Sequence, residues 1–523
     1  MPMKDSVPVL VGFGQVTLND EMSSDVSAAF VIAEAAKMAM VDTGLDLEQV
    51  SLQLEGLVVI DTMHRSMDNL PGSVADLLEI KHARQRLAPV SGHIPQVLIN
   101  RICAEISNGK SRATLIAGGE ALRSARALIR GGKKPFWEGV AGTAEPMFER
   151  KPFATEHERE HGIWLAKDVY PLYETSLRSY YGNSVEQHGN EIGEIWSSLS
   201  RVAAQNEYAW FRNEKSPADV ISTDSGNRLI TYPYTKTMNA MNQVDQGGAV
   251  LIMSQGEAKS MGIDPSKWIY MHAAAEADEH GFTSQRVNYH SSPAISAMGE
   301  SALSTANIQI SDVDYIDLYS CFPCAVEIAR DALGIQKTDS RPLTVTGGLS
   351  FNGGPGGSYV LTALATMAKL LRAEPESIGL ITANGGLLAE HAMGIYSTAA
   401  PKRTPSYDRA VINACQSKID SLNAPELDEN PCGLGVVEAY SVVHGKHGGP
   451  KLGIVIGRLV DLNGNKGSRF LANTPESMDL FEEMESTEFV GRSGLVTRIN
   501  GINVFDPECS TDDILKTLIR INL

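Results

Sequence analysis

Four loops of this 523-residue sequence combine glycine with side chains that could transfer protons or hold an oxyanion. They are residues 90–95 with His93, residues 317–324 with Tyr319 and Cys321, residues 346–358 with Asn352, and residues 383–391 with Asn384 and His391. Each loop follows a predicted strand or precedes a predicted helix, where turns and helix N-termini present N–H groups to anions. Because such groups stabilise oxyanions, this placement predicts a site for acid–base chemistry.

The side chains in these loops leave more than one role open. Cys321 and Cys324 form a C-x-x-C pattern, but a zinc or redox site needs a second pair or a thioredoxin-like context, and the sequence has neither. We therefore expect no metal, and Cys321 is either buried and inert or a proton carrier near a helix start. Tyr319 could be an acid or a hydrogen-bond donor. His391 is a base or a structural histidine, and His93 contacts a substrate or lies in a surface turn.

The loop at residues 346–358 contains six glycines in 13 residues. Glycine permits close approach of another group to the backbone, so this density indicates close packing or a bound ligand. The loop lacks the P-loop pattern and the dinucleotide fingerprint. A nucleotide-phosphate site of either type is therefore not expected.

Composition limits the classes of function. The 45 Lys and Arg and 63 Asp and Glu give a net charge of −18, which is too acidic for generic binding to a nucleic-acid backbone. No apolar run approaches the roughly 20 residues of a membrane-spanning helix, and the first residues lack the apolar segment of a secretory signal. Six cysteines are too few for a disulfide scaffold. These features predict a cytoplasmic protein with no membrane and no nucleic-acid partner.

Alternating strands and helices must position the four loops. Apolar runs at residues 56–61 and 113–119 predict buried strands on either side of a helix over residues 95–106. The same order recurs with strands at residues 315–319 and 378–382. The similar spacing of the two strand pairs indicates a weak internal duplication.

Two regions differ from the rest of the chain in composition and in hydrophobic pattern. Residues 131–235 hold four of the five tryptophans, many charges and helical patterns, which predicts a helical insertion that covers the sheet. Residues 424–523 follow an acidic, proline-bounded linker and contain β-branched runs divided by glycine turns. This pattern predicts hairpins in a small, separate β-rich domain.

The order and spacing of these motifs over residues 5–405 resemble the thiolase superfamily. The segments that carry the resemblance are Leu115-Ile-Ala-Gly-Gly-Glu-Ala121, Thr346-Gly-Gly348 and Gly353-Gly-Pro355. Three further segments are similar to thiolase-like proteins of type 1, which have an additional C-terminal domain. These segments are Val442-Val-His444, Gly453-Ile-Val-Ile-Gly-Arg-Leu459 and Arg469-Phe-Leu-Ala-Asn-Thr-Pro475.

The resemblance implies an α/β thiolase fold with two pseudo-symmetric βαβαβαββ halves in a layered αβαβα core. The N-terminal half is then residues 1–130 and 236–275, the helical loop domain residues 131–235, and the C-terminal half residues 276–410. Residues 424–523 form the additional β-rich domain, for which an OB-like barrel is one candidate. The ligand implied is a coenzyme A thioester, with no covalently bound cofactor.

Departures from the family pattern determine the chemistry that we expect. Ser91-Gly92-His93 stands where thiolases have their nucleophilic cysteine, and Gly354 replaces the histidine that activates it. The second family cysteine is also absent, near residues 382–384. Tyr319-Ser-Cys-Phe322 stands where sterol-carrier-protein-type thiolases have H-D-C-F, so Cys321 matches their acid/base, and the tyrosine resembles retro-aldol members that form no covalent intermediate. Thiolysis through an acyl-enzyme needs a thiolate and a base, so a different reaction is expected.

Three functions remain open. The leading hypothesis is an acyl-CoA-dependent C-acyltransferase or C–C lyase that works through an enolate. The alternatives are a catalytically degenerate CoA-ester-binding protein and an acetyl-CoA acetyltransferase. The candidate catalytic residues are Cys321, Tyr319, His391, His93 and Asn352, and the candidate oxyanion or cofactor-binding residues are Gly353, Gly354, Gly356, Gly357, Asn384 and Gly385. The family commonly dimerises through its core sheet, whereas an appended domain could leave a monomer.

Overall fold

The computed structural model describes residues 4–19, 26–64, 67–135, 137, 139–149, 151–224, 226–402, 405–461 and 463–509. The last part of the predicted C-terminal domain, residues 510–523, lies outside this description. Within the described residues, every helix is too short or too polar to span a membrane.

The first sheet is mixed and has six strands in the order β1-β8-β4-β2-β3-β5. Strands β2, β3 and β4 are parallel, and β8 runs antiparallel to β1 and β4. The strands are β1 (Pro8–Thr17), β2 (Gly56–Ile60), β3 (Arg84–Ala88), β4 (Ala113–Ala121), β5 (Glu145–Pro146) and β8 (Asp245–Ser254).

Helix α1 (Ala28–Asp42) packs very closely on this sheet because its buried face consists largely of alanine. A Cβ atom on Gly12 or Gly14 of β1 would lie 2.0 Å from the carbonyl oxygen of Ala39 or Ala35. Small residues on both surfaces therefore set the distance between helix and sheet. Helices α2 (Leu47–Gln53) and α3 (Leu70–Leu77) pack against α1.

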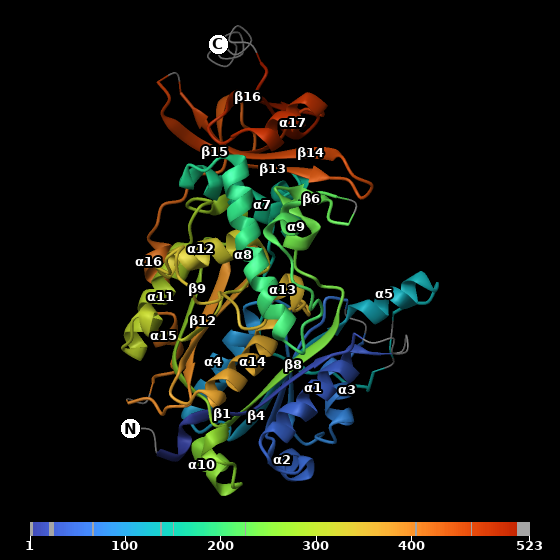
Figure 1. Ribbon diagram of the computed structural model, residues 1–523, viewed down its shortest axis with the longest axis vertical. Helices are drawn as coiled ribbons and strands as arrows, with labels where there is room; N and C mark the ends of the chain where they lie inside the picture. Colours follow the sequence, from blue (N-terminus) through green and yellow to red (C-terminus); the bar gives the residue numbers. More distant parts are fainter. Residues whose placement is uncertain are drawn as a thin grey trace.

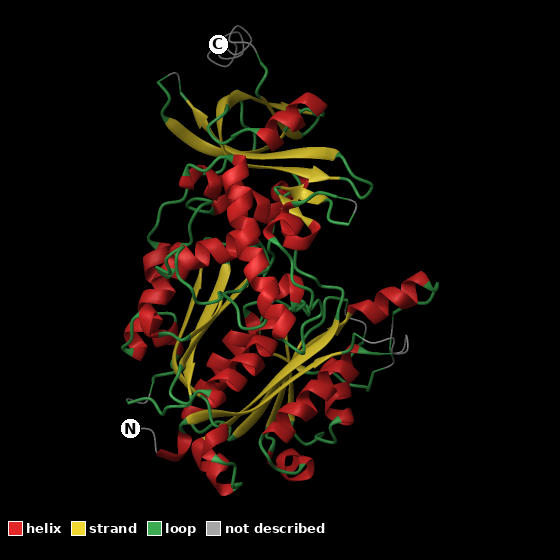
Figure 2. Cartoon of the chain, in the orientation of Figure 1, coloured by secondary structure: helices red, strands yellow, loops and turns green. Residues whose placement is uncertain are grey.

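The second sheet has the order β10-β11-β12-β9 and repeats the layered arrangement. Two helices, α4 (Ile94–Ser107) and α14 (Tyr359–Ala373), contact both sheets and form the middle layer (Figures 1 and 2). The outer helices are α11 (Pro293–Ala306) and α12 (Pro323–Ala332), and the strands are β9 (Tyr270–Asp278), β10 (Tyr315–Asp317), β11 (Ile378–Gly385) and β12 (Glu390–Ser397). The predicted five-layered α/β thiolase fold is confirmed.

The region between β4 and β8 is mainly helical. In Figure 1, α7, α9 and β6 lie above the core sheets, α8 runs down to α13, and α5 projects to the right. Its elements are α5 (Leu122–Arg130), α6 (Glu156–Glu160), α7 (Ala166–Tyr181), α8 (Val185–Gln205), α9 (Pro217–Ile221), β6 (Leu229–Tyr232) and β7 (Tyr234–Thr235). The remaining short helices are α10 (Gln255–Ser260), α13 (Gly348–Phe351), α15 (Arg409–Ile412) and α16 (Gln416–Asp420).

Strands β13 to β17 form a closed barrel at the end of the chain. The pairing order is β14-β15-β17-β16-β13, and β13 pairs with β14 to close the ring. Helix α17 (Met478–Ser486) lies between β15 and β16 in sequence, and a five-stranded barrel of this kind is found in OB folds. The strands are β13 (Gly433–His444), β14 (Pro450–Val460), β15 (Lys466–Asn473), β16 (Ser493–Ile499) and β17 (Ile502–Asp506). Strand β6 also pairs with β13, so the barrel sheet continues into the helical region.

The edge of the first sheet is covered by the chain itself. Strand β5 pairs with β3, and Arg84 at the start of β3 forms a two-pronged ion pair with Glu145 at 2.6 and 2.7 Å. Pro146 has no N–H to offer on the outer side of β5. A short, charged, proline-bearing edge opposes pairing with a second sheet.

We therefore predict that the protein is a monomer in solution. Sedimentation velocity at micromolar concentration should give a single species near the chain mass of 56.4 kDa. A stable species of twice this mass would contradict the interpretation of the covered edge.

Candidate active site

A cavity of about 860 Å³ opens where the start of α4 meets the turn between β11 and β12. Ser91 and His93 approach it from the α4 side, and Gly386, Leu387, Glu390 and His391 approach it from the β11–β12 side. Other walls are aromatic or charged and include Phe148, Phe153, Trp164, Arg101, Lys151 and Arg409. Two of the four predicted loops therefore meet on one cavity.

Ser91, His93 and Glu390 form a polar cluster on the cavity wall. His93 Nδ1 lies 3.1 Å from Ser91 Oγ and 3.3 Å from Glu390 Oε2, and Ser91 Oγ donates to the same carboxylate oxygen at 3.4 Å. A Cβ atom on Gly385 would lie within 2.4 Å of both Ser91 and His93, so only glycine fits there. Burial lowers the pKa of His93 more than nearby Glu390 raises it. The imidazole is therefore neutral near pH 7.

The Tyr319 hydroxyl lies directly behind the loop that begins α4. A Cβ atom on Gly92 would lie 2.2 Å from that hydroxyl oxygen and 2.3 Å from the Asn384 carbonyl oxygen. Tyr319, Asn384 and His391 line a second, small cavity of about 10 Å³, and His391 also borders the large one. The predicted site residues Tyr319, Asn384 and His391 are thus brought together, with Gly92 between the tyrosine and Ser91–His93.

Cys321 is buried like Tyr319 but lines neither cavity. Asn384 Nδ2 contacts its sulfur at 3.7 Å and donates to the Tyr170 hydroxyl at 3.1 Å. Burial raises the pKa of the Cys321 thiol to about 12, so it is protonated at neutral pH. Cys321 and Cys324 are free, buried thiols, and Cys103 is buried within α4 as expected.

His391 is held in one tautomer by the turn that precedes it. Its Nε2 lies 3.1 Å from the Leu388 carbonyl oxygen, which can only accept, so Nε2 carries the hydrogen. Nδ1 therefore presents a lone pair, and it has no hydrogen-bond partner among the described residues. Burial and the Arg286 charge lower the pKa of His391 to about 3.

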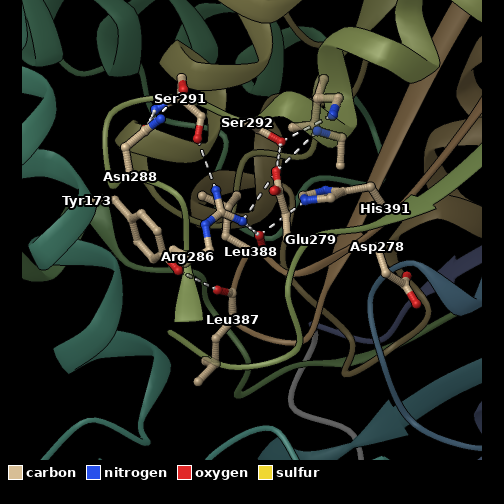
Figure 3. A network of polar contacts seen from close by, with 12 residues as sticks. Tyr173, Asp278, Glu279, Arg286, Asn288, Ser291, Ser292, Leu387, Leu388 and His391 are labelled. Atoms are coloured by element: carbon tan, nitrogen blue, oxygen red, sulfur yellow. Dashed lines mark hydrogen bonds and ion pairs between the residues drawn. The ribbon is translucent and has the colours of Figure 1, made fainter. Parts of the chain in front are cut away.

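The turn itself is left-handed at three consecutive residues. Gly386, Leu387 and Leu388 have φ values of 56°, 60° and 69°, and leucine rarely adopts this conformation. Figure 3 shows how the turn is held: Tyr173 donates to the Leu387 carbonyl at 3.2 Å, and Arg286 donates to the Leu388 carbonyl at 2.6 Å. These bonds fix the wall of the cavity at the point where His391 enters β12.

Arg286 is buried together with its counter-ion Glu279 and makes several of the contacts that hold the turn. Its guanidinium lies 3.3 Å from Glu279, both side chains are about 1% exposed, and it also donates to the Ser291 carbonyl at 3.0 Å (Figure 3). The central carbon (Cζ) of the Arg286 guanidinium lies 5.3 Å from the centre of the Tyr173 ring, within cation–π distance.

The glycine-rich loop lies against protein, and the structure does not bring it to the cavity as a set of free donors. The N–H of Gly354 donates to Met241, and the N–H of Gly356 donates to Gly354, at 2.9 and 2.8 Å. A Cβ atom on Gly353 would lie 2.1 Å from Gln246 Oε1, and one on Gly357 would lie 2.8 Å from the Ser91 amide nitrogen. These contacts explain the glycines by close packing.

Asn352 is not among the residues that line either cavity. Its Oδ1 accepts from Asn206 Nδ2 at 3.1 Å, and its own Nδ2 contacts the Gly353 carbonyl at 3.3 Å. These bonds give the Asn352 amide a role at the junction with α8.

Glu120 at the end of β4 is a buried acid beside this loop. Its Oε1 accepts from the Met63 N–H at 2.8 Å and would lie 2.3 Å from a Cβ atom on Gly356. Burial raises the pKa of Glu120 to about 8. Glu120 is thus protonated near pH 7.

Sequence patterns did not single out Glu390, Tyr170, Arg286 or Glu120 for the site. Glu390 had the clearest signal, since it directly precedes the candidate His391. Tyr170 and Arg286 come from segments without a glycine loop, and only the tertiary fold brings them to the turn and to Asn384.

Comparison with known proteins gives four findings. The pattern of the thiolase-like protein type 1 additional C-terminal domain matches residues 414–499. The monomeric SCP2-thiolase like protein type 1 from Mycobacterium smegmatis is 30% identical, with 96% of this chain and 99% of that chain covered and a TM-score of 0.80. An acetyl-CoA acetyltransferase of Methanocaldococcus jannaschii is 20% identical over 336 residues, which cover 63% of this chain and 76% of the relative. The structure of the Ltp2-ChsH2(DUF35) aldolase has the same fold, with 16% identity, 76% of this chain and 99% of that chain covered, and a TM-score of 0.58.

Replacement of Arg286 by alanine should destabilise the protein by about 3–5 kcal/mol, because it leaves the buried Glu279 carboxylate unpaired. Urea denaturation gives the free energy of unfolding. The double variant Arg286→Ala/Glu279→Gln should recover part of the loss, because it removes the orphaned charge. A double variant no more stable than Arg286→Ala would show that the lost ion pair is not the main cause of the destabilisation.

Replacement of Glu120 by glutamine should change how stability depends on pH. The folded-state pKa of about 8 lies above the ordinary value of 4.5, so the folded protein binds more protons than the unfolded chain between these values. Wild-type stability should therefore fall as the pH rises through this window, by at most about 1.4 kcal/mol per pH unit from this group. Glu120→Gln should lose less stability than wild type between about pH 5 and about pH 8 in urea denaturation. The exposed Glu48→Gln is the control and should follow wild type; an identical pH slope in Glu120→Gln would refute the assignment.

Proposed function

This chain belongs to the thiolase-like protein type 1 family, and on that premise we propose that it is an enzyme that cleaves or forms a C–C bond next to an acyl-CoA thioester. The observation that carries the proposal is the cavity wall, where His93, Glu390 and His391 meet with the Tyr319 hydroxyl behind Gly92. Within the described part of the chain, none of the residues lining this cavity is a cysteine. The wall therefore offers groups for proton transfer without a thiol nucleophile.

The character of the cavity supports an acyl-CoA ligand. Its volume of about 860 Å³ falls in the range of small-molecule sites. We propose Arg101 and Arg409 as contacts for the CoA phosphates, and Trp164 and Phe153 as apolar surface for the rest of the cofactor. Lys151 is paired with Asp278 at 2.8 Å, so it contributes less to phosphate binding.

The proposed reaction is a retro-aldol cleavage of a β-hydroxyacyl-CoA. The Glu390–His93 pair takes the proton of the β-hydroxyl group, the Cα–Cβ bond breaks, and its electrons move to the thioester as an enolate. The β-carbon leaves as a ketone or aldehyde, and the protonated pair returns a proton to the α-carbon. Tyr319 lines the small cavity behind Gly92 and not the large one, and in this proposal its hydroxyl donates to the enolate oxygen when the thioester reaches that small cavity. His391 borders both cavities and orients the substrate hydroxyl. An aldolase is among the proteins with this fold, which supports this reaction type.

Cys321 has a supporting role in this proposal. Its thiol is protonated and contacts the side-chain amide of Asn384. The backbone carbonyl oxygen of Asn384 faces Gly92. The thiol thus acts through Asn384 and helps to set the position of the loop beside Tyr319.

Replacement of Tyr319 by phenylalanine should lower turnover of a β-hydroxyacyl-CoA about 10²–10⁴-fold, because one proton donor to the reacting group is lost. His93→Gln should have an effect of similar size, whereas Cys321→Ala should cost less than about tenfold. The measurement is kcat on panels of β-hydroxyacyl-CoA and β-ketoacyl-CoA esters. Tyr315→Phe, at the start of strand β10 and four residues before Tyr319, is the matched control and should retain wild-type turnover. Unchanged turnover in both Tyr319→Phe and His93→Gln would eliminate these roles.

Titration calorimetry with CoA and acetyl-CoA separates the enzyme from a binding protein. Binding together with turnover of the panel supports the proposal, and tight binding without turnover supports the degenerate CoA-ester-binding protein. An assay with acetoacetyl-CoA and CoA tests acetyltransferase activity, and we expect no product because the cavity wall lacks a thiol.

A further inference from the structure

A buried cluster of metal-binding side chains lies where the helical region meets the C-terminal half of the core. Glu174 of α7, His188 of α8 and Glu327 of α12 place their ligand atoms within 4.8 Å of one another. Their exposed fractions are 0%, 2% and 0%. Helix α12 packs against both α7 and α8, and the cluster joins the three helices (Figure 1).

Glu327 is the unusual member of the cluster. Neither of its carboxylate oxygens has a hydrogen-bond donor among the described residues. The carboxylate of Glu174, in contrast, accepts from the Tyr234 hydroxyl at 2.5 Å and lies 2.5 Å from His188 Nε2. Burial, and after it the Glu174 charge, raise the pKa of Glu327 well above its ordinary value, so the site either keeps a proton on Glu327 or takes up a positive group.

The nearest arginines are committed to other partners. Arg178 donates to the Tyr232 and Tyr440 hydroxyls and pairs with Glu488, and Arg330 pairs with Asp331. A proton shared between the two glutamates would serve only one oxygen of Glu327. A cation between the side chains would engage both carboxylates and the imidazole.

We propose that Glu174, His188 and Glu327 bind one divalent transition-metal ion. Imidazole together with carboxylate oxygen suits Zn²⁺, Co²⁺, Ni²⁺ or Mn²⁺, whereas Mg²⁺ and Ca²⁺ prefer oxygen ligands alone. Ligand atoms about 2.1 Å from a tetrahedral metal ion are about 3.4 Å apart, so the His188–Glu174 contact of 2.5 Å opens by about 0.9 Å on binding. The Tyr234 hydroxyl remains on the second oxygen of Glu174 and orients that ligand.

The ion is structural in this proposal and lies outside the acyl-CoA cavity. It ties two helices of the region between β4 and β8 to α12 of the core. The Tyr234 hydroxyl that bonds Glu174 also accepts from the Cys324 N–H at 3.3 Å, near the start of α12. Metal binding therefore steadies the helix that follows the Tyr319–Phe322 segment, and it does not depend on the proposed reaction.

The test uses the full chain without a histidine tag, stripped with a chelator and then titrated with Zn²⁺ and, separately, Co²⁺. We expect one retained Zn²⁺ per chain by elemental analysis after gel filtration, and a rise in Tm of several degrees on Zn²⁺ addition. Co²⁺ should give visible d–d absorption bands. Glu327→Gln should lose the retained metal and the rise in Tm. Glu191→Gln, on α8 about one turn from His188 and 39% exposed, is the matched control and should keep both.

Two results would overturn the proposal. One is a wild-type protein that retains no Zn²⁺ and shows neither a shift in Tm nor Co²⁺ bands, and this result does not require the variant to fold. The other is a Glu327→Gln variant that retains metal to the same extent as wild type. If Glu327→Gln is as stable as metal-free wild type and the wild type binds no ion, the glutamates share a proton instead.

Discussion

The wall of the cavity depends on one buried cation. Arg286 is about 1% exposed, and it is compensated by Glu279, by two carbonyl oxygens and by the face of Tyr173. Its bond to Leu388 helps to keep two leucines in a left-handed conformation that they would not otherwise prefer. Because desolvating a guanidinium is costly, each of these partners must be in place at once, and the turn can adopt little else.

The same segment connects the site with the C-terminal barrel. Arg469 of β15 is fully buried and donates to the backbone carbonyls of Ser284 and Arg286. Its guanidinium also pairs with Glu438 of β13 at 3.1 Å. The backbone of Arg286, whose side chain bonds the cavity turn, is thus itself hydrogen-bonded to the barrel. The distant end of the sequence therefore contributes to the shape of a site whose His93, Glu390 and His391 come from the core.

Alternation of buried strands and helices is a local signal, and it predicted the order of these elements along the chain. The layers of the fold followed from the resemblance to thiolases. Loops at strand ends were also readable, and the structure brings Tyr319, Asn384 and His391 together as a result. Asn352 and the glycine-rich loop behaved differently, because a glycine that admits a neighbouring side chain looks the same in sequence as one that admits a ligand. Here the neighbours are Gln246 and Glu120. Arg286 and Tyr170 could not be predicted, since their roles arise from contacts across more than 100 residues of sequence. The domain boundaries and site roles remain predictions.

Strand β6 gives the barrel a partner from much earlier in the chain. Thr231 and Tyr232 pair with Val443 and Val442 of β13, while Thr175 of α7 bonds the backbone of Tyr440 on the same strand. The barrel strands can close into a ring by themselves, but β13 then exposes an unpaired flank. A chain that ended before the barrel would leave β6 without its partner β13. The core without the barrel, and the barrel without the core, would each expose an unpaired strand edge that can pair with other chains. We therefore expect the core and the barrel to be gained or lost together in evolution, and not to recombine as independent domains.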